Sequence, residues 1–296
     1  MAGTARSEAG RSLPNIVVLV LDTARADHLP MYGYGRDTTP ELKRFASQAT
    51  LFKHAISASN MTLSSHASMF TGQYASRHGA HYAVLPLSVS RPLDSRAETV
   101  AETLAKAGYR TMAVGANYGY LGVPWGLQQG FHGFDSRRPL QVVEHSQPAF
   151  PAFRVLPMRR ILGRLSGDET ERLFGRAEDM NRAAFRMLER SRSDERPFLL
   201  FLNYMEVHLP LLPPPAIRGR FPGFRPDIRT NTLSAYLSGG RVPEPIRQHW
   251  ISQYDASLVH LDAEIGRLFD HMRRLGFYDN TLIVVTSGSW RIRRRP

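Results

Sequence analysis

Three stretches of continuous apolar residues divide the chain, and each of them ends in polar side chains. They are NIVVLVLD at 15–22, RPFLLFLNYMEVH at 196–208 and NTLIVVTS at 280–287. Continuous rather than alternating hydrophobicity is typical of strands that are buried on both faces, as in a parallel sheet covered by helices. We therefore predict a buried strand in each of these three stretches.

Segments with helical periodicity separate these predicted strands. Thr39 is placed to cap a helix that has Pro40 in its first turn. In AETVAETLAKAGYRTMAVGAN, Gly108 is expected to end a helix and to precede a further strand. Strands that alternate with helices predict a layered α/β fold. The other predicted segments are helices over 168–191 and 246–275 and long loops over 116–165 and 209–245.

The carboxyl ends of the predicted strands bring several polar residues to one edge of the sheet. Ligands of α/β folds bind beyond these ends, which places Asp22, His208 and the residues that follow Ser287 at one rim. A buried carboxylate is costly unless it meets a cation or hydrogen-bond donors. Asp22 is therefore either a ligand for Ca²⁺, Mg²⁺ or zinc, or a cap for the next turn or a partner of Arg25.

The stretch TLSSHASMFTG, residues 62–72, concentrates hydroxyl groups where a loop is expected to run into a short helix. We expect Ser64 or Ser65 to cap that helix, with Thr62 just ahead of it. A helix N-terminus attracts tetrahedral oxyanions, and a metal-activated Thr62 hydroxyl could attack an anionic ester there. In the alternative interpretation, the Ser and Thr side chains only cap the helix.

Composition and charge argue against several classes of protein. The chain has no cysteine, so a disulfide, a thiolate zinc site and a cysteine nucleophile are impossible. The net charge is +12, but the 35 arginines are scattered and form no basic stripe interleaved with aromatic residues, which argues against nucleic-acid binding. A positive charge does favour a small anionic substrate. No apolar run approaches the about 20 residues that span a bilayer, and without a signal peptide we expect a cytoplasmic protein.

Several motifs, in the same order, resemble those of the sulfatase family within the alkaline-phosphatase superfamily. The likeness runs from about Pro14 to Ser287. It implies an α/β/α sandwich with a largely parallel central sheet. It also implies one divalent metal at the carboxyl edge of that sheet, Ca²⁺ first, with Mg²⁺, Mn²⁺ or Zn²⁺ as alternatives. The motifs are PNIVVLVLDTARADHLPMYGYGRDTTPELKRFA, TLSSHASMFTGQYASRHGA, GLQQGFHGFD, PFLLFLNYMEVHLPLLPPP and YDASLVHLDAEIGRLFDHMRRLGFYDNTLIVVTS.

The resemblance also implies metal-binding and catalytic residues. Asp22 corresponds to the first metal-binding aspartate of the family, and Thr23 stands where many sulfatases have a second aspartate. Thr62 corresponds to the nucleophile in the signature C/S-x-P-S-R-x-x-x-x-T-G and would also contact the metal. His66 corresponds to the arginine of that signature, so Thr62 and His66 are the expected catalytic residues.

Substrate-binding residues follow from the same resemblance. Ser65 corresponds to the serine of the signature, and His208 corresponds to the histidine of a PHxP-like turn that contacts the anionic group of the substrate. The expected partner is therefore a small anionic ester. Nothing in the pattern of residues indicates an oligomeric state.

Threonine at position 62 departs from the family pattern. Most sulfatases oxidise Cys or Ser to formylglycine, and threonine cannot give that aldehyde, so direct attack by the Thr62 alkoxide is favoured. Threonine accepts the phosphoryl group in related phosphoethanolamine and lipoteichoic transferases. We predict a metal-dependent hydrolase of sulfate esters. The alternatives are a phosphoryl or phosphonyl ester hydrolase or transferase, a catalytically inactive anion-binding protein, and a basic nucleic-acid-binding protein.

The resemblance ends at Gly288. The family continues with SDHGE, whose Asp and His complete the metal site, whereas this chain reads TSGSWRIRRRP. We therefore expect a chain truncated before that metal motif, with a shifted reading frame as one explanation. Metal binding is expected to be weak or absent, the chain is expected to be weakly active or inactive, and the last strand is expected to be an exposed edge. The expected divisions are a disordered tail at 1–13, a sulfatase-like domain at 14–287 and an unrelated Arg-rich tail at 288–296.

Overall fold

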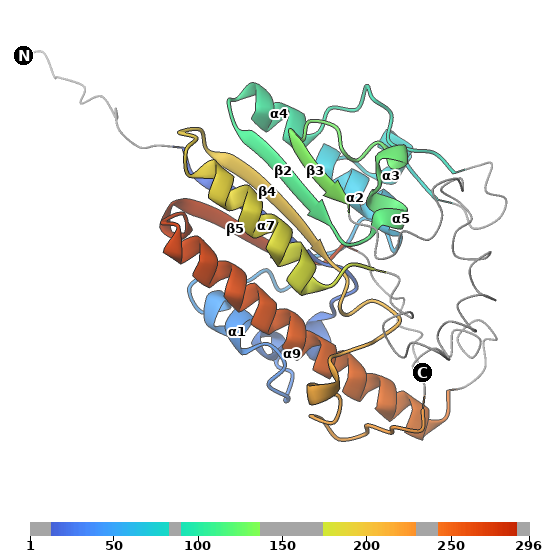
Figure 1. The fold of residues 1–296 in the computed structure, drawn as a ribbon. Helices are drawn as coiled ribbons and strands as arrows, with labels where there is room; N and C mark the ends of the chain where they lie inside the picture. The colour runs from blue at the N-terminus through green and yellow to red at the C-terminus, as the bar shows by residue number, and fades with distance from the viewer. Residues whose placement is uncertain (1–12, 83–89, 137–173, 229–241, 289–296) are drawn as a thin grey trace, which may run out of the picture.

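The computed structural model describes residues 13–82, 90–136, 174–228 and 242–288. Their five strands form one sheet in the order β3-β2-β4-β1-β5, and every neighbouring pair is parallel (Figure 1). The three strands predicted from continuous apolar stretches are present as β1, β4 and β5, and the strand predicted after Gly108 is β2. The strand bounds are β1 (Asn15–Leu21), β2 (Arg110–Gly115), β3 (Gly133–Ser136), β4 (Phe198–Tyr204) and β5 (Thr281–Thr286).

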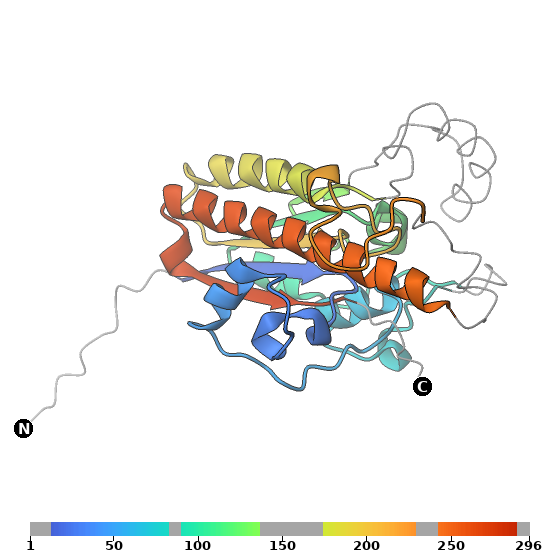
Figure 2. The ribbon, with the colours of Figure 1, turned by 90° about the horizontal axis from the view of Figure 1, so that it is seen from below.

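Helices cover both faces of this sheet (Figures 1 and 2). Helices α7 and α9 lie across one face, and α2 packs on the other. This arrangement confirms the predicted α/β fold with a parallel central sheet. The helix bounds are α1 (Pro40–Ala46), α2 (Thr62–Thr71), α3 (Ala75–His78), α4 (Val100–Lys106), α5 (Tyr118–Leu121), α7 (Ala177–Ser191) and α9 (Glu244–Arg274).

Two apolar cores form because successive residues of a strand point to opposite faces of the sheet. Val17 and Leu19 of β1 belong to the core beneath α7 and α9. Val20 of the same strand belongs to the second core, where it joins Leu63 and Phe70 of α2. The continuous apolar run of β1 is therefore needed, since both of its faces are covered.

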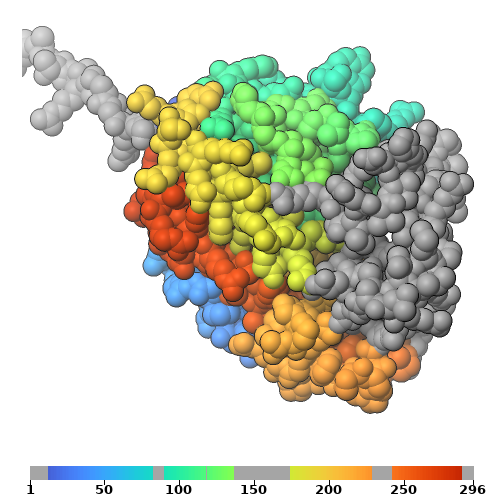
Figure 3. All heavy atoms as spheres, in the orientation of Figure 1, coloured from blue at the N-terminus to red at the C-terminus, as the bar shows by residue number. Residues whose placement is uncertain are grey.

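Helix α9 buries a stripe of apolar side chains against the first core. Their spacing of three to four residues places them on one side of the helix, which is why the sequence predicts this long helix correctly. In the space-filling view, α7 and α9 lie side by side and form the outer surface of this face (Figure 3). The fully buried residues of the stripe include Leu258, Leu261, Ile265, Leu268 and Met272.

The sheet determines where the functional residues lie. Strand β1 pairs with β4 on one side and with β5 on the other, with Leu21 opposite Tyr204 and Val20 opposite Thr286. All three strands therefore end at the same edge. The residues that follow them meet at one rim, as the sequence predicts.

Some elements differ from the sequence prediction. Helix α7 begins at Ala177, so the predicted helix is wrong at 174–176, and 168–173 lie outside the described residues. Strand β3 falls inside a predicted loop because it has only four residues, all half-buried, and so gives no long apolar run. Apart from Leu13 and Gly288, the predicted tails at the two ends of the chain also lie outside the described residues.

Strand β5 is an edge strand in the described part of the chain. Its neighbour is β1, and its other side has no strand partner among the described residues. Leu282 is 56% exposed and Val284 is 40% exposed. The prediction that this strand is buried on both faces is therefore wrong, whereas the expected exposed edge is present. None of the described helices combines the length and the apolar character that crossing a membrane requires.

Helix α1 is capped by a distant carboxylate instead of by Thr39. The Thr39 side chain makes no capping hydrogen bond. The backbone N–H groups of Glu41 and Leu42 donate to the two carboxylate oxygens of Asp262, at 2.8 and 2.9 Å. Asp262 lies on α9 and is 1% exposed. Burial raises the pKa of the Asp262 carboxyl to about 7, so this cap is sensitive to pH.

Replacing Asp262 with asparagine should change how stability depends on pH. The Asp262 carboxyl loses its proton near pH 4 in the unfolded chain, but only near pH 7 in the folded chain. Between these two pH values, the folded chain still holds the proton. Proton binding by Asp262 therefore stabilises the folded chain at low pH. This stabilisation is lost as the pH rises towards 7, by up to about 1.4 kcal/mol per pH unit. Urea unfolding of both proteins across this range measures the difference in slope, and equal slopes would contradict the assignment.

Candidate functional site

Asp22 lies at the rim formed by the carboxyl ends of β1 and β4. It follows β1 directly and is fully buried, and its backbone N–H donates to the Tyr204 carbonyl at 2.9 Å. The next residue, Thr23, has a φ of 61°, a left-handed conformation that is rare for a β-branched residue. Its Oγ1 donates to the Val207 carbonyl at 2.7 Å. Thr23 is therefore tied to the turn that follows β4.

Thr62 is the first residue of α2, and the fold brings it to Asp22. Its Oγ1 donates to Asp22 Oδ2 at 3.3 Å, and Asn117 Nδ2 donates to the same Oγ1 at 3.5 Å. All three side chains are buried. The N-cap residue, Met61, offers no side-chain acceptor to the first N–H groups of the helix. The amide donors and the positive end of the α2 dipole therefore lie beside Thr62.

Ser64 and Ser65 lie inside the first turn of α2 and do not cap it, which corrects the prediction. Both are buried. Ser64 Oγ donates to the Ala80 carbonyl at 3.0 Å, and Ser65 Oγ donates to the Thr62 carbonyl at 3.2 Å. Because the helix begins at Thr62 and not after it, these hydroxyls meet carbonyl acceptors instead of free N–H groups.

His66 is fully buried and holds the first turn of α2 in place. Its Nδ1 lies 2.8 Å from the Thr62 carbonyl, and its Nε2 lies 3.4 Å from Asn203 Nδ2. A carbonyl can only accept, so Nδ1 carries the proton, and Nε2 accepts from the Asn203 amide. Burial lowers the pKa of His66, and the nearby Asp22 charge opposes this only in part. The ring is therefore neutral, unlike the arginine to which it corresponds.

The chain returns to these residues after β5. A Cβ placed on Gly288 would lie 2.7 Å from His66 Cε1 and 3.3 Å from Asp22 Oδ1. The Gly288 carbonyl accepts a hydrogen bond from Ser57 Oγ at 3.1 Å. Position 288 therefore faces Asp22 and His66, but it contributes no side chain to them.

His208 lies on the turn that follows β4, as predicted, but its contacts are with other residues of the rim. Its backbone N–H donates to the Met205 carbonyl, and its Nδ1 donates to the Leu209 carbonyl at 2.8 Å. The imidazole packs edge-on against the Phe174 ring, with 4.9 Å between ring centroids. The structure thus brings Asp22, Thr62, Ser65 and His66 together, whereas the contacts shown for His208 are with its own turn and Phe174.

We refer to Asp22, Thr62, His66 and Asn117 as the Thr62 site. Its oxygen donors for a metal are the Asp22 carboxylate and the Thr62 hydroxyl, whereas a hard cation prefers six or more oxygens. Among the described residues, no group of three His, Asp or Glu side chains surrounds it. The residues present therefore do not form a complete site for the metal that the fold implies.

Two residues of this region have no counterpart in the sequence predictions. Asn117 contacts the Thr62 hydroxyl, and Asn203 contacts His66. Both are at most 1% exposed. Asn203 interrupts the apolar run FLLFLNY, and a polar residue in a buried strand needs hydrogen-bond partners. That interruption is the signal that could have identified it, whereas Asn117 stands in a predicted loop without such a contrast.

Comparisons with known proteins find similar sequences over almost the whole chain. The family model described as Sulfatase matches residues 14–288. The chain is similar to human arylsulfatase A, at 28% identity over 291 residues, which covers 93% of this chain and 51% of that protein. It spans about half to just over three fifths of the length of the curated relatives it matches first.

Solved structures share the fold at low sequence identity. One is a complex with its substrate D-glucosamine-2-N,6-O-disulfate, with a TM-score of 0.64, 17% identity and coverage of 93% of this chain and 65% of that one. Another is the phosphonate monoester hydrolase of Agrobacterium radiobacter, with a TM-score of 0.59, 16% identity and coverage of 92% and 62%. These likenesses establish the architecture of the chain.

Proposed function

Because the chain belongs to the sulfatase family, we propose that the Thr62 site cleaves sulfate esters, with Thr62 as the attacking group. One observation carries this proposal: the Thr62 hydroxyl lies at the tip of α2 and 3.3 Å from Asp22 Oδ2. A tetrahedral anion fits the open amide groups of a helix N-terminus. The same tip would then hold the sulfate group next to the hydroxyl that attacks it.

Each residue of the site has a distinct task in this proposal. Thr62 Oγ1 attacks the sulfur atom while its proton passes to the Asp22 carboxylate. The bond between sulfur and the ester oxygen breaks, and that oxygen takes up a proton as the alcohol leaves. Asn117 donates to Thr62 Oγ1 and orients it. His66 acts as a positioning residue, since its neutral ring holds the Thr62 carbonyl. Water then attacks the sulfur atom, the bond from sulfur to Thr62 Oγ1 breaks, and sulfate leaves as Oγ1 regains its proton.

A divalent metal is usual in this family. Here Asp22 and Thr62 would contact it, and its charge would stabilise the oxygen that attacks. Because these two residues provide few of the donors that a hard cation needs, we propose that metal binding at this site is weak. Slow turnover by this chain follows.

A phosphate or phosphonate ester is the second candidate substrate. The observation that favours it is the threonine itself, which cannot form the aldehyde used by most sulfatases but can attack as an alkoxide. Sulfate and phosphate esters are both tetrahedral anions, so the α2 tip would accept either. The relative rates at which the chain cleaves sulfate, phosphate and phosphonate esters therefore decide which ester is its substrate.

Release of phenol from aryl sulfate, aryl phosphate and aryl phosphonate esters tests the proposal directly. We expect slow cleavage of the aryl sulfate, and loss of that cleavage in Asp22→Asn, which removes the proton acceptor. A sulfated hexosamine is a suitable second substrate. Preference for a phosphorus ester would support the second candidate. Anion binding without cleavage of any ester would indicate a binding protein and contradict the proposal.

A further inference from the structure

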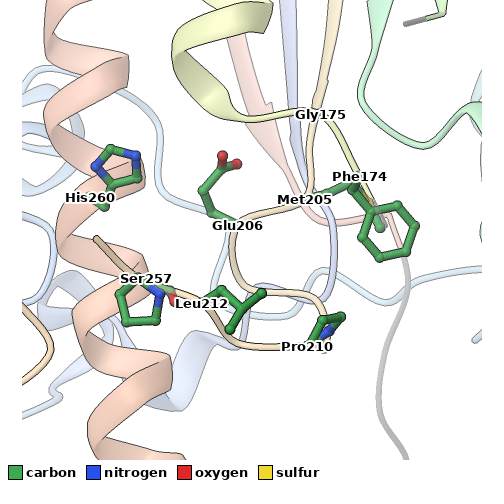
Figure 4. Close-up of a pocket in the computed structure, with 9 residues that line it drawn as sticks. Phe174, Gly175, Met205, Glu206, Pro210, Leu212, Ser257 and His260 are labelled. Atoms are coloured by element: carbon green, nitrogen blue, oxygen red, sulfur yellow. The ribbon is translucent and has the colours of Figure 1, made fainter. Parts of the chain in front are cut away.

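A second cluster of metal-ligand side chains lies apart from the Thr62 site. Glu178 on α7, Glu206 on the turn after β4 and His260 on α9 each offer one ligand atom, and these atoms lie within 4.8 Å of one another. Figure 4 shows the Glu206 carboxylate and the His260 ring facing each other across a pocket. We refer to these three residues as the Glu206 cluster.

Polar atoms of this cluster lack hydrogen-bond partners within the described residues. Glu206 Oε1 accepts from the Ala177 backbone N–H, but Glu206 Oε2 and Glu178 Oε2 are buried and have no partner. His260 Nε2 lies 3.1 Å from Glu178 Oε1 without the alignment of a hydrogen bond. Unpaired buried polar atoms are costly, so a ligand that supplied partners to Glu206 Oε2, Glu178 Oε2 and His260 Nε2 would stabilise this region.

A small cavity adjoins Glu206 and His260, whereas Glu178 is not among its lining residues. It has a volume of about 30 Å³, and its polar lining includes Glu206, His260 and Ser257. One water needs about 10–15 Å³ of such volume, so the cavity has room for an ion and a water. Its other lining residues are largely apolar, among them Phe174, Met205, Pro210 and Leu212.

The charges of the cluster favour a cation. The cluster holds two acidic side chains and one imidazole, and the contact between His260 and Glu178 engages only one of the two acids. A divalent cation between the three side chains would neutralise both carboxylates.

We propose that Glu178, Glu206 and His260 bind one divalent transition-metal ion, with Zn²⁺ as the probe. Imidazole nitrogen favours zinc and its neighbours over Ca²⁺ or Mg²⁺. Three protein ligands with a fourth position open to water are a common zinc arrangement. Zinc lies about 2.0–2.2 Å from such ligands, so small side-chain rotations close the cluster around it. The ion ties α7, α9 and the turn that carries His208 together, and this inference does not depend on the proposed esterase activity.

Calorimetric titration of the chelator-treated chain with Zn²⁺ tests the site. We expect one Zn²⁺ bound per chain. His260→Gln or Glu206→Gln should weaken this binding at least about tenfold, since replacing a residue that only hydrogen-bonds to a metal ligand already lowers metal affinity by that factor. Co²⁺ should give visible absorption bands that the same variants lose. Circular dichroism checks that each variant is folded, and Glu178→Gln serves where another variant fails to fold.

Two control variants make the test specific. His271, also on α9, lies 3.7 Å from Glu189 of α7, but no third ligand joins this pair among the described residues. His271→Gln should therefore bind Zn²⁺ as the unmodified chain does. Asp22→Asn should keep this Zn²⁺ and lose only the weaker metal binding at the Thr62 site, which separates the two sites. No Zn²⁺ binding by the unmodified chain, unchanged binding by His260→Gln, or an equal loss in His271→Gln would overturn the proposal.

Discussion

Replacing Thr62 with alanine is expected to reduce cleavage of aryl sulfate by at least about a thousandfold, because removal of a nucleophile costs this much or more in enzymes with covalent intermediates. The fold should survive the change. The hydrogen bonds of Thr62 Oγ1 are long, at 3.3 and 3.5 Å, so their loss should cost only about 1 kcal/mol of stability. Single-turnover rates and urea unfolding of both proteins measure the two effects.

Two further replacements separate the hydroxyl from the shape of the side chain. Thr62→Ser keeps the hydroxyl and should retain most of the activity. Thr62→Val keeps the branched shape without the hydroxyl and should be as inactive as Thr62→Ala. Activity in Thr62→Val equal to that of the unmodified chain would exclude Thr62 as the attacking group.

Replacing Gly288 with aspartate is expected to destabilise the metal-free chain. The new Cβ would lie 2.7 Å from His66 Cε1, and overpacking of this kind costs about 1–3 kcal/mol. The new carboxylate would also face the Asp22 carboxylate, since the Cβ lies 3.3 Å from Asp22 Oδ1, and like charges at short range repel. Thermal unfolding without metal should therefore begin at a lower temperature than in the unmodified chain.

Divalent metal should reverse much of this loss, since a second carboxylate completes more of a metal site. Thermal unfolding with and without Ca²⁺, Mg²⁺ or Mn²⁺ gives the response. Gly288→Ala is the matched control, because it has the same contact with His66 but no carboxylate. It should be destabilised without responding to metal. An equal metal response in the two variants would contradict the view that position 288 faces the Thr62 site.

The sequence predicts the frame of the fold well because its strongest signals are long. The continuous apolar runs give β1 and β4, and the stripe from Leu258 to Met272 gives α9. Strand β3 has only four half-buried residues, too few for a pattern to stand out. Strand β5 has the composition of a buried strand, but its position at the edge depends on what packs beside it, which local pattern does not encode.

The candidate site is predictable only in part, for a similar reason. Asp22 and Thr62 stand out because one ends a buried strand and the other opens a hydroxyl-rich segment, and the fold does bring them together. The neutral state of His66 depends on burial and on the Thr62 carbonyl. The Glu206 cluster joins three segments that share no motif. Such features arise from tertiary packing and are not visible in any one stretch of sequence.

Mass spectrometry of the peptide that contains residue 62, after prolonged incubation of the chain with aryl sulfate and an acid quench, shows whether Thr62 is the attacking group. We expect a sulfo group on the Thr62 hydroxyl, absent in Thr62→Val. A sulfo group on Ser64 or Ser65, or phenol release with an unmodified peptide, would contradict it. The absence of both product and adduct at saturating substrate would contradict it equally.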